Sequence, residues 1–200
     1  HLSDEFTLAQ GSLNMPNDST ALHAHEADEA YDEHEHDELD LAILQFWDDA
    51  ATAIGLDPEA DWDAFAFGGP GMDDEQVDEL AARVANGVKR ATTALQWEHD
   101  ATEAPLPRPG DLHIILDAAG APRALVRTTR VDVMPICDVD DEFAAVEGEG
   151  DGTLAYWQDA HFRVFNALAR DLGREPALDM PVVCERFELV YPAPTEGARS

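Results

Sequence analysis

Lysine is almost missing from this chain. Its 200 residues include twelve basic residues, of which only Lys89 is a lysine and the rest are arginines. Arginine stays charged at any accessible pH, whereas a partly buried lysine can lose its proton and act as a base. Lys89 is therefore either one remaining surface lysine or a residue whose role arginine cannot fill. Its neighbours favour a specific role for Lys89, because Gly87 precedes it and two residues with hydroxyl groups, Thr92 and Thr93, follow it.

Positive charge is scarce as a whole. Acidic residues outnumber basic residues 43 to 12, which gives a formal net charge of −31 and a pI near 4.2. Such a surface repels phosphate backbones and anionic membranes at long range. It also resists aggregation in strong salt, where exposed charges are screened. The composition indicates a halophilic protein from a high-salt cytoplasm, and an acidic protein from an ordinary cytoplasm is the alternative.

Cysteines and long apolar runs are also few. Cys137 and Cys184 lie in apolar stretches without a C-x-x-C pair, so two buried free thiols are expected rather than a disulfide. Membrane-spanning runs and a basic-then-apolar leader are both missing. The sequence therefore predicts a cytoplasmic chain with no membrane partner. We also expect no cofactor and no metal, and the oligomeric state stays open.

The first 38 residues read as a disordered acidic tail. Between Ala24 and Asp40, acids occupy nearly every second position without any lysine or arginine, so too little apolar surface exists to offset the ordering entropy. Two H-x-H pairs in this segment have the composition of a Zn²⁺ or Ni²⁺ site, but no scaffold to hold one: His23, His25, His34 and His36. We expect one domain over 39–192 and a short tail over 193–200.

Apolar periodicity predicts helices first and strands later. Helical spacing appears in three segments, 39–54, 73–86 and 153–172. Asp73 and Gln76 resemble a capping box at the start of the second helix, and Gly87 is placed to end it. The first two helices are separated by a predicted loop with aromatic anchors and a glycine-rich end: Trp62, Phe65, Phe67 and 68–71.

Strand-like segments rich in Val, Ile and Thr follow at 92–97, 111–117, 122–134 and 182–191. Helices followed by strands with one inserted helix predict an α+β domain. Its sheet should be small and closed or half-closed.

The first candidate site is Lys89 with the two threonines. If the backbone is still helical or bent, a lysine and a threonine three residues later point to the same side. In a straight strand their side chains point to opposite faces. Gly87 favours a bent junction between the helix and the strand. A threonine hydroxyl also needs a neighbouring base to become a nucleophile.

Two further groups carry candidate chemistry. In the segment 143–151, glutamate and glycine alternate after an apolar run, which predicts a tight loop before a helix. Because Glu147 follows the apolar run, we expect it to be only partly exposed. Asp151 reads as a helix cap. His161 shares a helix face with Trp157 and Phe165, where a histidine is either a hydrogen-bonded core residue or a catalyst.

The order of these motifs resembles the ASCH-domain family, in its longer bacterial and archaeal branch. The resemblance covers roughly 39–191. It is carried by Phe67-Gly68, Gly87-Val88-Lys89-Arg90-Ala91-Thr92, Pro109-Gly110-Asp111, Phe143-Ala144-x-x-Glu147-Gly148-Glu149-Gly150-Asp151, Trp157 with His161, and Glu185-Arg186-Phe187. The resemblance implies a PUA-like β-barrel with flanking helices and an association with RNA.

The resemblance also implies site residues. Some family members are ribonucleases, and one small branch is an amidohydrolase that removes the acetyl group of N4-acetylcytidine with a lysine, a threonine three residues later and a downstream glutamate. By position, the catalytic residues are Lys89, Thr92 and Glu147. Glu149 is the alternative to Glu147, and Thr93 the alternative to Thr92. Substrate contacts are expected from Arg90, Thr93, Glu149, Trp157 and His161.

Three functions remain open from the sequence. The leading hypothesis is a hydrolase acting on a modified nucleoside or a short RNA, and the alternatives are a non-catalytic RNA-binding module and a small-ligand sensor or adaptor. The only dense basic region spans Arg83 to Arg130. Its arginines favour RNA if they converge on one face around Lys89, and a small neutral substrate if they scatter.

Overall fold

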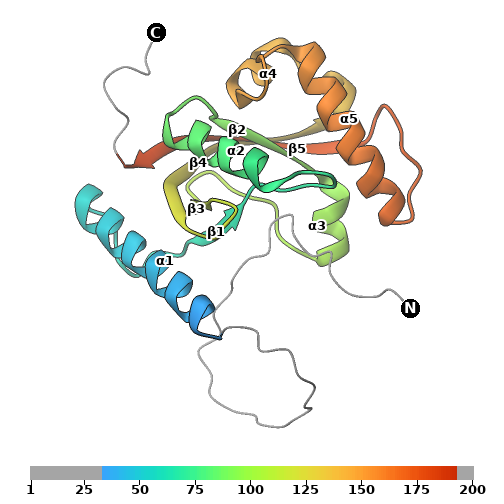
Figure 1. Cartoon of the computed structure of the whole chain (residues 1–200). Coiled ribbons are helices and arrows are strands. Elements are labelled where there is room, and N and C mark those ends of the chain that lie inside the picture. Colours follow the sequence, from blue (N-terminus) through green and yellow to red (C-terminus); the bar gives the residue numbers. More distant parts are fainter. Residues whose placement is uncertain (1–32, 193–200) are drawn as a thin grey trace, which may run out of the picture.

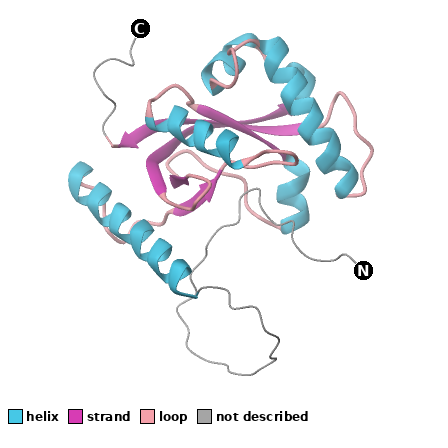
Figure 2. Cartoon of the chain, viewed as in Figure 1, coloured by secondary structure: helices cyan, strands magenta, loops and turns pink. Residues whose placement is uncertain are grey.

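The computed structural model describes the backbone of residues 33–192 and the side chains of residues 38–192. This region is mixed α+β, as the sequence predicts (Figure 1; Figure 2). Its α-helices are α1 (Glu33–Ile54), α2 (Asp74–Ala85), α3 (Gln96–Thr102), α4 (Asp141–Glu147) and α5 (Leu154–Asp171), and a short 3₁₀ turn, η1, spans Ile136–Asp138. Its strands are β1 (Asp63–Ala66), β2 (Ala91–Leu95), β3 (Leu112–Leu116), β4 (Pro122–Pro135) and β5 (Pro181–Tyr191).

The strands form one curled sheet, a half-barrel, in the order β1-β3-β4-β5-β2. β1 pairs in parallel with β3, and the other neighbours pair antiparallel. The long pairing of β4 with β5 shifts register near Leu125 and again near Thr128. Such irregularities bend a strand and increase its twist, which curls the sheet. The half-closed sheet expected from the sequence is confirmed.

Three apolar clusters among the described residues join helices to this sheet. Trp47 of α1 packs against β1 and β3. Val84 of α2 packs against β3, β4 and β5. Phe143 of α4 and Trp157 of α5 pack against β2 and β5. α1 therefore lies on a different side of the sheet from α4 and α5 (Figure 1), and the segment between α2 and β2 lies close to the end of α4.

Local capping signals correctly placed α2. The Asp73 side chain accepts a hydrogen bond from the Gln76 backbone at 3.0 Å, and the Gln76 side chain accepts one from the Asp73 backbone at 3.0 Å. This reciprocal pair satisfies two backbone N–H groups that have no partner inside the helix. After the helix, Gly87 has φ +70°, a left-handed conformation that glycine adopts at little cost.

Three short elements correct the sequence expectations. The segment expected as an aromatic loop contains β1, which is only four residues long and pairs with the distant β3. The segment expected as a glutamate–glycine loop begins with α4, whose N-cap Asp140 accepts a hydrogen bond from Phe143 N at 2.9 Å. The strand expected over 92–97 ends at Leu95, where α3 begins. A strand of four residues and helices of seven residues, about two turns, are too short to show a clear period in the sequence.

Two boundary expectations need comment. α1 already begins at Glu33, whereas the sequence placed the start of the domain near Leu39. Residues 1–32 and 193–200, and the side chains of the H-x-H pairs, lie outside the described residues. Cys184 is buried as expected, but Cys137 is exposed on η1, so the expectation of two buried thiols was wrong for Cys137. None of the described helices combines the length and apolar character needed to cross a bilayer.

Candidate functional site

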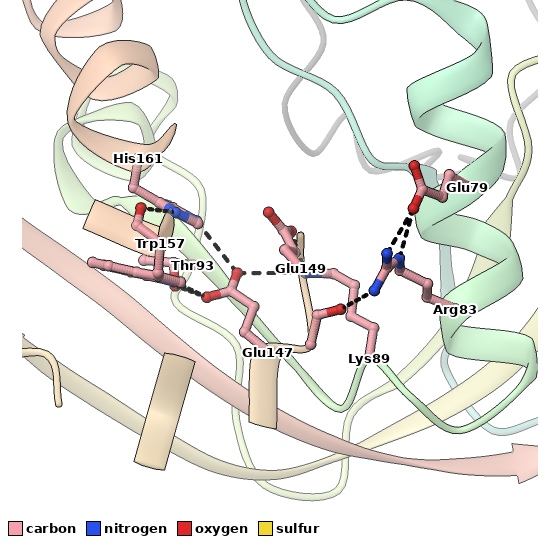
Figure 3. Close-up of polar contacts among 9 residues, drawn as sticks. Glu79, Arg83, Lys89, Thr93, Glu147, Glu149, Trp157 and His161 are labelled. Atoms are coloured by element: carbon pink, nitrogen blue, oxygen red, sulfur yellow. Dashed lines mark hydrogen bonds and ion pairs between the residues drawn. The ribbon is translucent and has the colours of Figure 1, made fainter. Parts of the chain in front are cut away.

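The Lys89 side chain is directed into the protein by the turn between α2 and β2. Val88 N and Lys89 N both donate to Arg83 O, at 2.8 and 3.1 Å, after the reversal at Gly87. The side chain of Lys89 is fully buried as a result, with an exposed fraction of 0%. The junction between helix and strand is thus bent, and the only lysine of the sequence is an interior residue (Figure 3).

Two carboxylates surround the Lys89 ammonium. Its Nζ atom lies 2.5 Å from Glu149 Oε1 and 3.4 Å from Glu147 Oε1. It also lies 5.0 Å from the centroid of the Phe67 ring. A buried cation is tolerated only when it is paired and hydrogen-bonded. Both glutamates come from the end of α4 and the turn that follows it, so α4 supplies the counter-charges for Lys89.

Glu147 is fixed by three further groups. Thr93 Oγ1 donates to Glu147 Oε2 at 2.9 Å, and Trp157 Nε1 donates to the same oxygen. His161 Nε2 lies 3.4 Å from Glu147 Oε1. His161 Nδ1 donates to the Trp157 carbonyl at 2.9 Å, and the two rings stack with centroids 4.1 Å apart. The Glu147 carboxylate therefore has a fixed position and orientation (Figure 3).

The charges of this cluster balance when His161 is protonated. Burial alone would raise the pKa of Glu147, but the charges of Lys89 and His161 and the hydrogen bonds from His161 and Trp157 hold that pKa well below its ordinary value. Burial alone would likewise lower the pKa of His161, but Glu147 and Glu149 raise it. Two carboxylates, one ammonium and one imidazolium then form a neutral buried group.

Arg83 holds the turn after α4 against α2. Its Nη1 donates to Gly148 O at 2.8 Å and its Nη2 to Gly150 O at 3.5 Å, while its Nε donates to Glu79 at 2.9 Å. The turn approaches closely, because a Cβ atom at Gly148 would lie 2.6 Å from Val88 O. Arg83 was missed as a positioning residue. The sequence shows its helical pairing with Glu79, but not its bond to a carbonyl 65 positions away.

Thr92 and Arg90 are not part of this cluster. Successive residues of a strand face opposite sides. Thr93 faces α4 and donates to Glu147, so Thr92 faces the other side, beside its register partner Glu185 in β5. The Arg90 side chain is exposed, and its backbone bonds to Val146 O and to Phe187 N. Six of the predicted site residues are thus brought together: Lys89, Thr93, Glu147, Glu149, Trp157 and His161.

A cavity of about 210 Å³ adjoins the cluster. Thr93, Phe67 and Phe165 border both, and Thr92 lines the cavity as well. Its titratable wall residues are four carboxylates and two histidines: Asp63, Glu98, Asp111, Glu185, His99 and His113. Among the described residues, the cavity walls contain neither lysine nor arginine. Sequence reasoning missed this cavity, because its walls come from four strands, two helices and two connecting loops that are distant in the sequence.

The arginines of the basic region carry compensated charges. Four of them form ion pairs with nearby carboxylates, and these pairs are Arg83–Glu79, Arg123–Asp117, Arg127–Glu188 and Arg130–Asp132. Arg90 and Arg108 are exposed. The cavity walls include none of the six. The positive potential is therefore not concentrated at the candidate site.

The carboxylate cluster also has the geometry of a small metal site. Glu147, Glu149 and His161 each offer one ligand atom, and these atoms lie within 4.8 Å of one another. Here the ammonium of Lys89 already supplies a positive charge to both glutamates. We therefore describe this group as an ion-pair cluster.

Comparisons with known proteins identify the family. The family model of the ASCH domain matches residues 64–191, so the chain belongs to the ASCH domain family, which is RNA-associated. An ASCH domain from Lactobacillus crispatus JV V101 is 28% identical, with a TM-score of 0.67 over 80% of this chain and 98% of that chain. A protein from Enterococcus faecalis V583 is 32% identical, with a TM-score of 0.66 over 76% and 91%. The PUA-like fold is thereby confirmed. No curated protein matches the chain.

Proposed function

We propose that this ASCH protein is a hydrolase acting on a modified nucleoside, whose base occupies the cavity beside Lys89. The observation that carries the proposal is the position of Thr93. Thr93 lines the cavity, and its hydroxyl donates at 2.9 Å to Glu147, a buried carboxylate that also pairs with the Lys89 ammonium. A hydroxyl bonded to a fixed carboxylate, which a cation in turn pairs with, is an arrangement that can activate a nucleophile.

The arrangement fits hydrolysis of an amide carried by the base. Thr93 Oγ1 would form a bond to the carbonyl carbon and pass its proton to Glu147, while Lys89 stabilises the developing oxyanion. The C–N bond then breaks. The proton then passes from Glu147 to the departing nitrogen. Water would then cleave the ester on Thr93. Thr92 is the alternative nucleophile, since it also lines the cavity.

The walls of the cavity favour a small uncharged substrate over a polynucleotide. Four carboxylates and no described lysine or arginine line it, so a phosphate group would be repelled. The cavity volume of 210 Å³ lies below the range of roughly 300–1,000 Å³ that drug-sized ligands occupy. A single nucleoside with an acylated amino group, such as N4-acetylcytidine, combines these properties with the RNA association of the family.

The test is turnover by the purified chain in high salt. N4-acetylcytidine and short RNA oligomers are offered separately, and released cytidine, acetate and RNA fragments are measured by chromatography. We expect hydrolysis of the nucleoside and intact RNA. Cleavage or tight binding of the oligomers without hydrolysis of the nucleoside would instead identify a ribonuclease or an RNA-binding module.

Matched variants assign the roles of the residues. Thr93→Val should lower kcat on the order of 100-fold or more, because the hydroxyl is lost while the shape is kept. The control is Thr129→Val, an exposed strand threonine that donates to Arg186 O at 3.0 Å. Lys89→Arg should also abolish turnover, because a planar guanidinium cannot take the place of the compact ammonium. Full activity of Thr93→Val together with loss in Thr92→Val would assign the nucleophile to Thr92.

A further inference from the structure

Glu185 and His113 form a second polar group on the cavity wall, apart from the Lys89 cluster. Glu185 lies on β5 beside Thr92, facing away from the α4 side. Its Oε1 accepts a hydrogen bond from Thr128 Oγ1 of β4 and lies 3.8 Å from His113 Nε2 of β3. Three neighbouring strands of the half-barrel thus supply one carboxylate, one imidazole and one hydroxyl.

This group has hydrogen-bonding capacity left over. Both ring nitrogens of His113 are buried and have no hydrogen-bond partner among the described residues. The contacts of Glu185 within the described residues all pass through Oε1, so Oε2 is left for a ligand. Buried polar groups are nearly always hydrogen-bonded, and leaving them without a partner is costly. A ligand in the cavity that both group members line would supply the missing partners.

The residues around Glu185 and His113 fix the orientation of both side chains. The Phe65 ring packs edge-on against His113 with centroids 5.7 Å apart. Thr128 is buried and donates to Glu185 Oε1, so the other carboxylate oxygen, Oε2, is directed away from Thr128. Burial raises the pKa of Glu185, and the bond from Thr128 and the nearby His113 oppose that rise. The ligand therefore meets an acceptor from Glu185 next to a histidine nitrogen.

We propose that Glu185 and His113 together determine specificity by binding the edge of a base that carries an exocyclic amino group beside a ring nitrogen. Glu185 Oε2 accepts from the amino group, and a protonated ring nitrogen of His113 donates to the ring nitrogen of the base. Carboxylates are the natural acceptors for the amino group of cytosine. Uracil presents the reverse pattern, because a carbonyl oxygen replaces the amino group. The assignment rests on the proposed function for its ligand class, and it concerns residues that do not perform the hydrolysis.

The substitution Glu185→Gln separates this role from a purely structural one. If Thr128 keeps its present role as the donor, it bonds to the oxygen of the new amide, and the amide nitrogen then faces the ligand. The amide N–H of the variant then donates a hydrogen bond at the position where the carboxylate oxygen of Glu185 accepted one. The preference for an amino group should therefore change into a preference for a carbonyl, which a merely structural glutamate would not produce.

The experiment is a calorimetric titration of the full chain in high salt with cytidine and with uridine, neither of which carries a cleavable acyl group. We expect the wild type to bind cytidine about tenfold or more tightly than uridine. Glu185→Gln should reverse this order. Glu188→Gln is the matched control, an exposed glutamate of the same strand paired with Arg127, and it should keep the wild-type order. Thermal unfolding verifies that each variant is folded.

Thr128→Val is the second variant, and it answers the question if Glu185→Gln does not fold. Without the donor behind it the carboxylate is no longer oriented, so the ratio of the two affinities should fall towards one. An unchanged preference in the folded variants, or a wild type that binds neither nucleoside, would overturn the assignment. The proposed function is judged separately. Reversal without hydrolysis of N4-acetylcytidine rejects only the hydrolase, and hydrolysis without reversal rejects only the assignment of Glu185 and His113.

Discussion

Lys89 pairs with two carboxylates at once, the buried Glu147 and the half-buried Glu149, so its charge is central to the stability of the site. Lys89→Met keeps most of the stem but removes the ammonium that Glu147 and Glu149 share, so that only His161 is left to offset two carboxylates. Breaking a buried ion pair from one side costs about 3–5 kcal/mol of the free energy of unfolding. We expect a loss of this size in urea unfolding at constant high salt.

Two comparisons test the cause of that loss. Adding Glu149→Gln to Lys89→Met removes one uncompensated charge and should restore part of the stability. Arg123→Met is the control at a half-exposed ion pair with Asp117, and it should change the free energy of unfolding by less than about 1 kcal/mol. Equal losses in Lys89→Met and Arg123→Met would contradict the prediction.

The raised pKa of His161 makes stability depend on pH. A group whose pKa is raised on folding contributes its full stabilisation at a pH below its pKa in the unfolded chain, which is near 6.5 for histidine. That contribution is lost as the pH rises through the pKa of the group in the folded protein. Glu147 has the opposite sign, since its lowered pKa gives a contribution that is present above about 4.5 and is lost as the pH falls. The cluster should therefore be most stable between about pH 5 and about pH 6.5.

His161→Gln tests this dependence. The free energy of unfolding in urea should fall between pH 6 and pH 9 in the wild type, and it should fall less in the variant. The difference between the two losses should be about 1.4 kcal/mol for each unit by which folding raises the pKa of His161. His99→Gln is the contrast, because burial lowers the pKa of His99, partly offset by the Pro105 carbonyl and by Asp100. The loss above pH 6.5 should persist in His99→Gln, and its disappearance there would refute the assignment to His161.

At the scale of an element, the turn after α4 depends on a close backbone approach. Gly148 and Gly152 both have left-handed backbones, with φ of +68° and +73°. A Cβ at Gly148 would lie 2.6 Å from Val88 O, whereas a Cβ at Gly152 would have no neighbour within 4 Å. Alanine is strained at both positions, but only Gly148→Ala forces α4 away from the segment that carries Lys89.

We therefore expect Gly148→Ala to be less stable than Gly152→Ala by about 1–3 kcal/mol, the usual cost of overpacking. Urea unfolding of the two variants side by side measures the difference, since the shared strain cancels. Gly148→Ala should also lose turnover, because the Lys89–Glu147 distance changes. Two variants of equal stability would show that the backbone can shift without cost.

At the scale of the whole molecule, the net charge of −31 should make folding depend on salt. Like charges on the surface repel one another and destabilise the compact state. Raising the salt from about 0.01 M to about 1 M shortens the Debye length from about 30 Å to about 3 Å, so the free energy of unfolding should rise. Thermal unfolding across this series measures the effect, and sucrose at matched osmolality is the control for solvent effects. A flat response would contradict the high-salt interpretation.

The features of this protein that depend on neighbours along the chain can be predicted from the sequence. The capping box of Asp73 and Gln76, the reversal at Gly87 and the helical face of α5 follow from short-range spacing, because the groups that interact are a few residues apart. The resemblance added the family and the PUA-like fold, both of which are confirmed. It also singled out Lys89 and Glu147, which the fold brings together.

Which threonine faces Glu147, and where the cavity lies, depend on contacts between residues far apart in the sequence. The bond from Thr93 to Glu147 spans 54 positions and the ion pair of Lys89 with Glu147 spans 58. Which face of β2 meets α4 is set by the register with β5 and by packing on α5, and a shift of one residue would have presented Thr92 instead. β1 and the polar group of Glu185 and His113 likewise exist only through pairing between distant strands, for which the local sequence carries no signal.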